Sequence, residues 1–202
     1  MDNNARSERT RAAVIKAALT IIARDGAGHL TLDAISKESG ISKGGLLHQF
    51  PNKRAVLAAL LDHQAGFFAA FSQNFMEAHG AEYAQPRLAA QIATLREVLK
   101  EPNSLAFAVL AAASQDPSFL STIRGGDAET IAAIRAEAAA PDLAVQHWFA
   151  ARGLAFSVLL GLCPLDPAER QSLFQRLLDG LRRPEKGLGT LAKPRRARKI
   201  GA

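Results

Sequence analysis

The residues best suited to chemistry in this chain lie close together, between positions 31 and 53. The run Ser42-Lys-Gly-Gly45 places a hydroxyl, an ammonium group and two residues without side chains next to one another. A helix start with Ser at its N-cap can hold a phosphate through its hydroxyl and its backbone N–H groups. Two successive glycines let the backbone approach a bulky partner closely. The pattern therefore predicts a site for a polyanion.

Two short helices joined by a glycine turn would position this run. Helical periodicity predicts Leu32–Ser39 and about Lys43–Phe50, with Gly40 in the turn and Pro51 ending the second helix. Two such helices make a helix-turn-helix, whose second helix enters the major groove of DNA. We expect four apolar side chains to pack this pair against a first helix over about Glu8–Arg24: Ile35, Ile41, Leu46 and Phe50.

The composition predicts helices throughout. Among 202 residues there are 40 Ala and 26 Leu, but only 6 Val, 10 Ile and 7 Thr. Ala and Leu favour helices, whereas β-branched residues fill strands. We therefore expect an all-α fold of about nine helices, with a three-helix DNA-binding domain over 1–52, a helical domain over 53–183 and a basic, disordered tail over 184–202.

Several helices of the second domain have readable signals. A fourth helix meets no breaker before about His79, and a sixth is expected over Ser104–Ser114. Gly125-Gly126 should kink or split a helix between Asp116 and Ala140. Asp166, with Glu169 three residues on, predicts a capping box for the last helix.

The helix expected over 142–163 is apolar almost all round, so two of its faces must be covered. We assign Val145, Trp148, Phe149, Phe156 and Leu159 to one side, and Leu154, Val158 and Leu162 to another.

Charge is distributed unevenly. Residues 1–55 carry nine Lys/Arg and five Asp/Glu, residues 56–181 eight and thirteen, and residues 182–202 eight and one. Basic ends favour a polyanion, either nucleic acid or an anionic membrane surface. The longest nearly uncharged apolar stretch, Gly153–Leu165, has 13 residues, short of the ~20 of a membrane span. With no secretory signal and a single cysteine, we expect a cytoplasmic protein outside the membrane.

Catalytic patterns are not evident in the sequence. It has no phosphate-binding glycine loop, no metal-ligand spacing and no Gly-x-Ser-x-Gly motif. Its five histidines are never three or four residues apart. Cys163 is interpreted as a small buried hydrophobe, with a redox sensor as the alternative. We expect no enzyme, no metal site and no cofactor.

The run Gly40-Ile-Ser-Lys-Gly-Gly-Leu-Leu-His-Gln-Phe50-Pro-Asn-Lys53 resembles the N-terminal domain of the TetR family of bacterial transcriptional regulators. The resemblance covers residues 8–60, about a quarter of the chain, and the remainder fits the family's variable effector domain in length. Two positions depart from the family pattern: Gly45 stands where Thr is frequent, and Leu47 where Tyr is frequent. Leu47 can offer only apolar contact, for example to a thymine methyl group.

The resemblance implies DNA contacts at eight positions. Thr31, Ser42, His48 and Lys53 correspond to phosphate-contacting residues, whereas Lys43, Gly44, Gly45 and Leu47 face the base edges.

A plainer interpretation stays open for several of these residues. The two hydroxyl residues can be helix caps alone, His48 can pack on the first helix, and Lys53 can be a solvated residue at a helix start. The basic arm Arg6–Arg11 and the tail Lys193–Lys199 either contact DNA or remain solvated.

The resemblance also implies a homodimer, in which the last two helices of each chain form a four-helix bundle. It implies a pocket in the middle of the chain for a small, mostly apolar effector. The candidate ligand residues are aromatic and polar side chains of this region, namely His63, Phe67, Phe71, Phe107, Gln115, His147 and Arg152. An aromatic stripe at helical spacing is also what an ordinary core would show.

Together these features predict a repressor that leaves a palindromic operator in double-stranded DNA when the effector binds. The fourth helix would couple the two events, because it joins Lys53 to the segment Phe67–Phe75. The alternatives are a ligand-independent or protein-regulated repressor or activator, and a small-molecule binder with vestigial DNA binding. Intact Lys43, His48 and Lys53 argue against the last of these.

Overall fold

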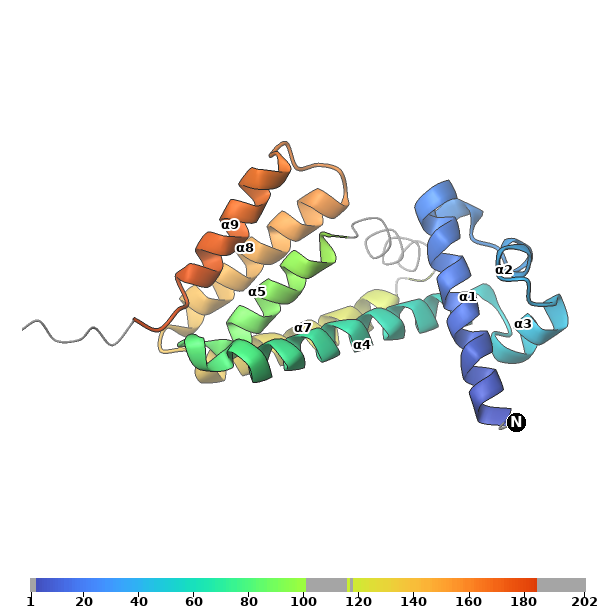
Figure 1. The fold of residues 1–202 in the computed structure, drawn as a ribbon, viewed down its shortest axis with the longest axis horizontal. Coiled ribbons are helices and arrows are strands. Elements are labelled where there is room, and N and C mark those ends of the chain that lie inside the picture. Colours follow the sequence, from blue (N-terminus) through green and yellow to red (C-terminus); the bar gives the residue numbers. More distant parts are fainter. Residues whose placement is uncertain (1–2, 101–115, 117, 185–202) are drawn as a thin grey trace, which may run out of the picture.

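The computed structural model describes residues 3–100, 116 and 118–184, and this part of the chain forms eight α-helices (Figure 1). The predicted all-α class is confirmed, and about nine helices is close to the number observed. The helix predicted over 104–114 and the basic tail lie outside the described residues, apart from Pro184.

The N-terminal helices are α1 (Asn3–Asp25), α2 (Leu32–Ser39) and α3 (Lys43–Gln49), with a 3₁₀ turn at Ala27–His29. The predicted start of α1 at Glu8 is wrong by five residues. The early turns are helical because no Pro or Gly interrupts them, and the side chains of Arg9 and Thr10 donate to carbonyl groups four residues back.

Local side-chain bonds explain where the next helices begin and end. Thr31, Ser42 and Asn52 each accept a hydrogen bond from the backbone N–H three residues on, at 3.0, 3.3 and 2.9 Å. These bonds satisfy N–H groups that have no partner within α2, α3 or the following helix. Gly40 ends α2 with φ +69°, a left-handed conformation that glycine adopts without strain.

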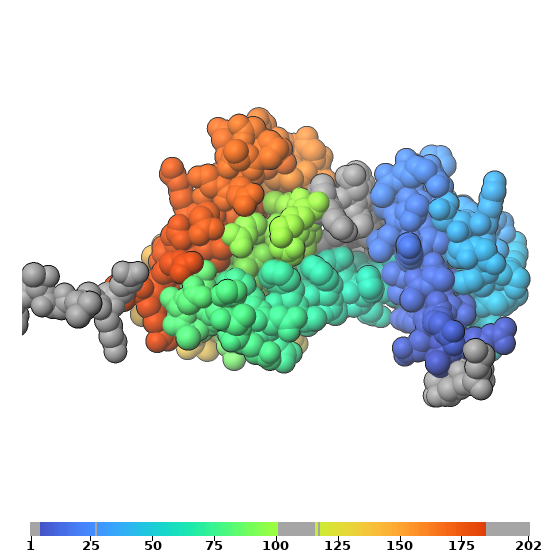
Figure 2. Space-filling view, in the orientation of Figure 1, coloured from blue at the N-terminus to red at the C-terminus, as the bar shows by residue number. Residues whose placement is uncertain are grey.

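Helix α4 (Lys53–His79) joins the two parts of the molecule. Its first turns pack on α1, and its length lies along α5 (Pro86–Val98) after a 3₁₀ turn at Gly80–Glu82. Figure 2 shows α1–α3 as a lobe at one end, with α4 leading away from it. By length and composition alone, the helical segment Lys53–Glu82 could cross a membrane, because an 18-residue stretch within it has a mean hydropathy of 1.3. Core helices of soluble proteins pass the same test, so this is weak evidence.

The remaining helices are α7 (Phe119–Glu137), α8 (Pro141–Leu159) and α9 (Pro167–Asp179). Of the kink or split expected at Gly125-Gly126, the split is wrong, because α7 runs through both residues. Glycine weakens a helix by only about 1 kcal/mol, and packing of α7 against α8 offsets this cost. The predicted capping box at Asp166 and Glu169 is confirmed.

Helix α8 differs from the prediction in its end and in its faces. It ends at Leu159, and Gly161 follows with φ +69°, so Cys163 lies beyond the helix and is only half-buried. Trp148 is 3% exposed but Phe149 is 54% exposed, so assigning them to one side was wrong. Successive helical residues point 100° apart, so neighbours do not share a face.

Candidate nucleic-acid interface and effector region

The predicted packing of the helix-turn-helix is confirmed. Ile35, Leu46 and Phe50 are fully buried in one cluster with residues of α1 and the start of α4, and Ile41 packs against this cluster. Because Leu46 and Phe50 hold one side of α3 against this cluster, the residues on its other side face solvent.

The outward residues of α3 are the predicted contact positions. Ser42, Lys43, Gly44, Gly45 and His48 are exposed, and Leu47 is 40% exposed. The exposure of His48 disfavours the alternative in which it packs on the first helix.

Positions next to α3 complete this surface. Thr31 is exposed and Lys53 is half-buried. Thr31 and Ser42 are both helix caps, as their alternative interpretation held. A capping hydroxyl accepts one bond from the backbone and keeps its own hydrogen for a further acceptor.

Two side-chain contacts that the sequence did not reveal tie α3 to its neighbours. The Nζ atom of Lys43 lies 2.7 Å from Oδ1 of Asp33 on α2. The Nε2 atom of Gln49 donates to the hydroxyl of Ser7 on α1 at 2.8 Å. The first pair is exposed and stabilises the fold little, but it holds the Lys43 ammonium group at the start of α3.

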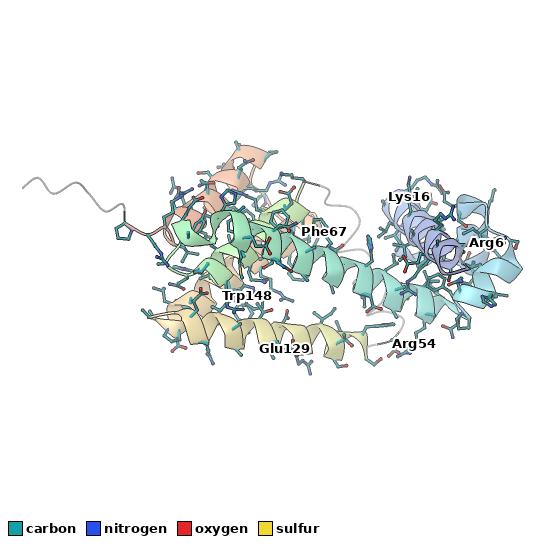
Figure 3. The ribbon with its side chains drawn as sticks, turned by 60° about the horizontal axis from the view of Figure 1, so that its bottom comes forward. Arg6, Lys16, Arg54, Phe67, Glu129 and Trp148 are labelled. Carbon is teal, nitrogen blue, oxygen red and sulfur yellow. The ribbon has the colours of Figure 1, made fainter. Side chains whose placement is uncertain are left out.

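The basic N-terminal arm is part of α1. Arg6, Arg9 and Arg11 lie on its first turns and are exposed, and Figure 3 shows Arg6 and Lys16 along the helix. The guanidinium carbon of Arg11 lies 5.5 Å from the centroid of the Phe50 ring. These charges are therefore carried by a rigid element beside α3.

The effector-region candidates on α4 form an aromatic row. Phe67 is 43% exposed, and its ring centroid lies 6.2 Å from those of Phe68 and Phe71. Phe71 is half-buried and His63 is exposed.

The candidates on α8 lie in a different environment. Arg152 is half-buried, forms an ion pair with Asp127 of α7, and has its guanidinium carbon 4.9 Å from the Trp148 ring centroid. His147 is half-buried on the same helix. The candidates Phe107 and Gln115 lie outside the described residues.

A groove of about 240 Å³ lies between α4, α5 and α7. None of the five described ligand candidates lines it. No sequence pattern predicts this groove, because α7 contributes to its lining together with the consecutive helices α4 and α5. Its polar lining consists of Ser72, Arg87, Gln91, Glu129 and Thr130.

Large apolar side chains are exposed on α8, beyond its end, and on α9. Phe149, Phe156 and the C-cap residue Leu160 recur at helical spacing along one side of α8, about 100° around the helix from Trp148. Leu162 is 71% exposed and Leu173 of α9 is 40% exposed. Contiguous exposed apolar side chains of this kind mark interaction surfaces.

Two family models match this chain. Residues 14–60 match "Bacterial regulatory proteins, tetR family", and residues 85–182 match "Tetracyclin repressor-like, C-terminal domain". Together they cover more than two thirds of the chain. A search of curated proteins finds no match.

Several solved structures share the fold. A candidate TetR-family transcriptional regulator from Rhodococcus sp. has a TM-score of 0.66 and 19% identity, covering 86% of this chain and 98% of its own. A TetR-family regulator from Marinobacter aquaeolei VT8 has a TM-score of 0.62 and 15% identity, covering 89% and 98%.

The multidrug binding protein EbrR in complex with imidazole has a TM-score of 0.55 and 19% identity, covering 91% of this chain and 93% of its own. Its complex with ethidium is also similar, with a TM-score of 0.53. The helix-turn-helix, the helical C-terminal part and both family models agree, and the chain belongs to the TetR family of bacterial transcriptional regulators.

Proposed function

We propose that this protein is a cytoplasmic, homodimeric repressor that leaves a palindromic operator when a small, mostly apolar molecule binds its second domain. The observation that carries the proposal is the exposed surface of α3, where the predicted contact residues Ser42, Lys43, Gly44, Gly45, Leu47 and His48 are all exposed. The domains would divide near residue 52, where Asn52 caps α4.

On DNA, α3 lies in the major groove. The hydroxyls of Thr31 and Ser42 and the side chains of His48 and Lys53 bind phosphates, which sets the register of the helix. The base edges are contacted by Lys43, Gly44, Gly45 and Leu47. To contact a base, the Lys43 side chain must leave its ion pair with Asp33. Because the two glycines have no side chains, the backbone of α3 can approach the DNA closely.

The exposed apolar face of α8 and α9 makes the dimer. Two chains related by a twofold axis present their α3 helices about one DNA turn apart, ~34 Å, which matches the two half-sites of a palindrome. Burying Phe149, Phe156 and Leu173 between two chains removes apolar area from water, which is the main driving force of such association.

The effector acts by binding the DNA-incompetent form more tightly than the competent form, because equal binding to both shifts nothing. Candidate contacts are His63, Phe67 and Phe71 on α4, and His147 and Arg152 on α8. Phe107 and Gln115 are candidates from outside the described residues. The complex of EbrR with ethidium supports an aromatic ligand, which would stack on the Phe67–Phe71 row.

The test is selection of DNA from a random-sequence pool by the purified protein. We expect a palindrome whose half-sites lie about one turn apart. The double variant Lys43→Ala, His48→Ala should not enrich it, because it lacks a base contact and a phosphate contact. The matched control is Lys100→Ala, His79→Ala, which removes the same side-chain types from exposed positions distant from α3 and should enrich the same palindrome.

Sequence-blind, salt-sensitive binding that is equal in all three proteins would overturn the proposal. The basic ends of the chain would then explain the affinity.

A further inference from the structure

A residue of the second part of the chain is buried in the core of the first. Phe119, the first residue of α7, is 7% exposed and belongs to the buried cluster of α1–α3 and the start of α4. The other buried members of that cluster all lie between Val14 and Leu60. The start of α7 therefore packs into the cluster that α1–α3 form with the first turns of α4.

Arg54 holds this contact from the other side. Its Nε atom donates to Oδ2 of Asp116 at 2.6 Å, and its terminal nitrogen donates to the hydroxyl of Ser118 at 3.3 Å. Its guanidinium carbon lies 5.2 Å from the centroid of the Phe119 ring. Figure 3 shows Arg54 next to the beginning of α7. One side chain thus meets three successive described positions of the α7 start.

Asp116 is itself held in place for this interaction. Its Oδ1 atom accepts a bond from the backbone N–H of Ser118 at 2.9 Å, and its carbonyl accepts one from Phe119 at 3.1 Å. The hydrogen bond from Arg54, followed by those from Ser118, lowers the pKa of Asp116 to about 2. The carboxylate is therefore ionised at any physiological pH.

The position of Arg54 gives the contact its meaning. It follows Lys53, a proposed phosphate contact, in the first turn of α4. At the other end of the contact, α7 packs along α8, carries Asp127 beside Arg152, and lines the groove at Glu129. If α4 alone joined the DNA-binding helices to the second domain, these two parts could pivot about it. A second contact away from the axis of α4 opposes that pivot.

We propose that Arg54 is a positioning residue that, with Asp116, Ser118 and Phe119, fixes the angle between the DNA-binding helices and the second domain. This inference rests on the proposed function, because in a dimer that angle sets the distance between the two α3 helices. It gives the second domain a route to the DNA-binding surface that does not pass through the length of α4.

A competing role for Arg54 is a direct phosphate contact, because its side chain is 64% exposed. The two roles differ in their dependence on Asp116. A positioning Arg54 has no function without its carboxylate partner, whereas a phosphate-binding Arg54 keeps its function. The effects of removing each partner therefore overlap in the first case and add in the second.

The first test measures the angle without DNA. Spin labels are attached to cysteines at two exposed positions, Lys37→Cys of α2 and Ala132→Cys of α7. The native cysteine is removed by Cys163→Ser, and the labelled protein is diluted with unlabelled protein so that only the distance within one chain is measured. We expect a narrow distribution that becomes at least twofold wider in Asp116→Ala and in Arg54→Ala. The double variant should be no wider than either single variant. Arg135→Ala removes an ion pair with Asp142 that does not involve the α7 start, and it should leave the width unchanged.

The second test uses DNA. The wild type should bind its selected palindrome at least tenfold more tightly than the same palindrome with one base pair added at its centre. Each single variant should lower this ratio at least threefold, and the double variant should lower it no further.

Unchanged distance widths in the single variants would overturn the inference even if no operator were found. Additive losses of operator affinity in the double variant would assign Arg54 to phosphate binding instead. Failure of the wild type to select a palindrome would count against the proposed function, and the distance measurement would still decide the positioning role.

Discussion

Leu46 and Leu47 are neighbours in α3 with opposite surroundings. Leu46 is fully buried among α1–α4, whereas Leu47 is 40% exposed on the surface proposed to face DNA. Leu46→Ala should lower the free energy of unfolding by ~2–5 kcal/mol, because it leaves a cavity in a packed core. Leu47→Ala should change it by less than ~0.5 kcal/mol but weaken operator binding. Denaturant unfolding and operator titration of both variants check this pair, and similar stability losses would contradict it.

Asp116 predicts a dependence of stability on pH. Its pKa falls from 3.8 to about 2 in the folded protein, so the ionised carboxylate stabilises the fold above pH 3.8. That contribution is lost as the pH falls from 3.8 towards 2. Asp116→Asn should therefore melt below the wild type at pH 7, and the difference should shrink as the pH falls through this range.

Thermal melts at several pH values check this prediction, with Asp142→Asn as the control. Asp142 is 89% exposed and 3.4 Å from Arg135, so its loss should matter less. A difference between wild type and Asp116→Asn that stays constant down to pH 2 would contradict it.

The residues that the sequence placed well are those governed by local rules. Thr31 and Ser42 cap the starts of α2 and α3, and Gly40 ends α2. Each of these roles depends only on residues a few positions away, so the sequence is enough to predict it. The Arg54–Asp116 pair joins residues 62 positions apart, and no periodicity connects them. Only the packing of the α7 start against the first turn of α4 brings these two residues together.

At the scale of elements, capping residues located helix starts better than glycine or proline located helix ends. The capping box of α9 and the Asn52 cap of α4 are of this kind. The expected split of α7 was wrong because glycine preference is a small energy that tertiary contacts readily exceed. The start of α1 was placed five residues too late, although neither Pro nor Gly interrupts its first turns.

The unbroken α7 makes a prediction about Gly126. A Cβ atom added there meets nothing within 4 Å, and the backbone is helical. Gly126→Ala should therefore stabilise the protein by about 0.5–1 kcal/mol, because alanine loses less backbone entropy on folding. Gly40→Ala is the opposite control, since its φ of +69° strains alanine and should lower stability. Thermal melting checks both signs, and a destabilised Gly126→Ala variant would be contrary to expectation.

At the scale of the whole molecule, the exposed face of α8 predicts an oligomeric state. Phe156→Glu should convert a dimer into a monomer, because it would replace an apolar ring by a charged carboxylate where two apolar surfaces meet. Leu120→Glu alters a residue of α7 that is 42% exposed and should leave the dimer intact. Light scattering at micromolar concentration checks both variants, and a monomeric wild type would contradict the dimer itself.

The effector region was the least predictable part of the molecule. Residues of a binding site must converge in space, and the candidates lie on α4 and α8, with α5 packed against both helices. The polar groove between α4, α5 and α7 takes its lining from positions such as Ser72 and Glu129, which look like ordinary solvated residues in the sequence.

The length of α4 has a geometric consequence. Its 27 residues span ~40 Å, at ~1.5 Å per residue. A tilt of about 5° at one end of such a rod displaces the other end by ~3.5 Å. That displacement is close to the ~3.4 Å rise between successive bases of a DNA strand. We therefore expect that a small repacking of Phe75 against Tyr83, whose ring centroids lie 5.7 Å apart, can tilt α4 enough to shift α3 by about one base step.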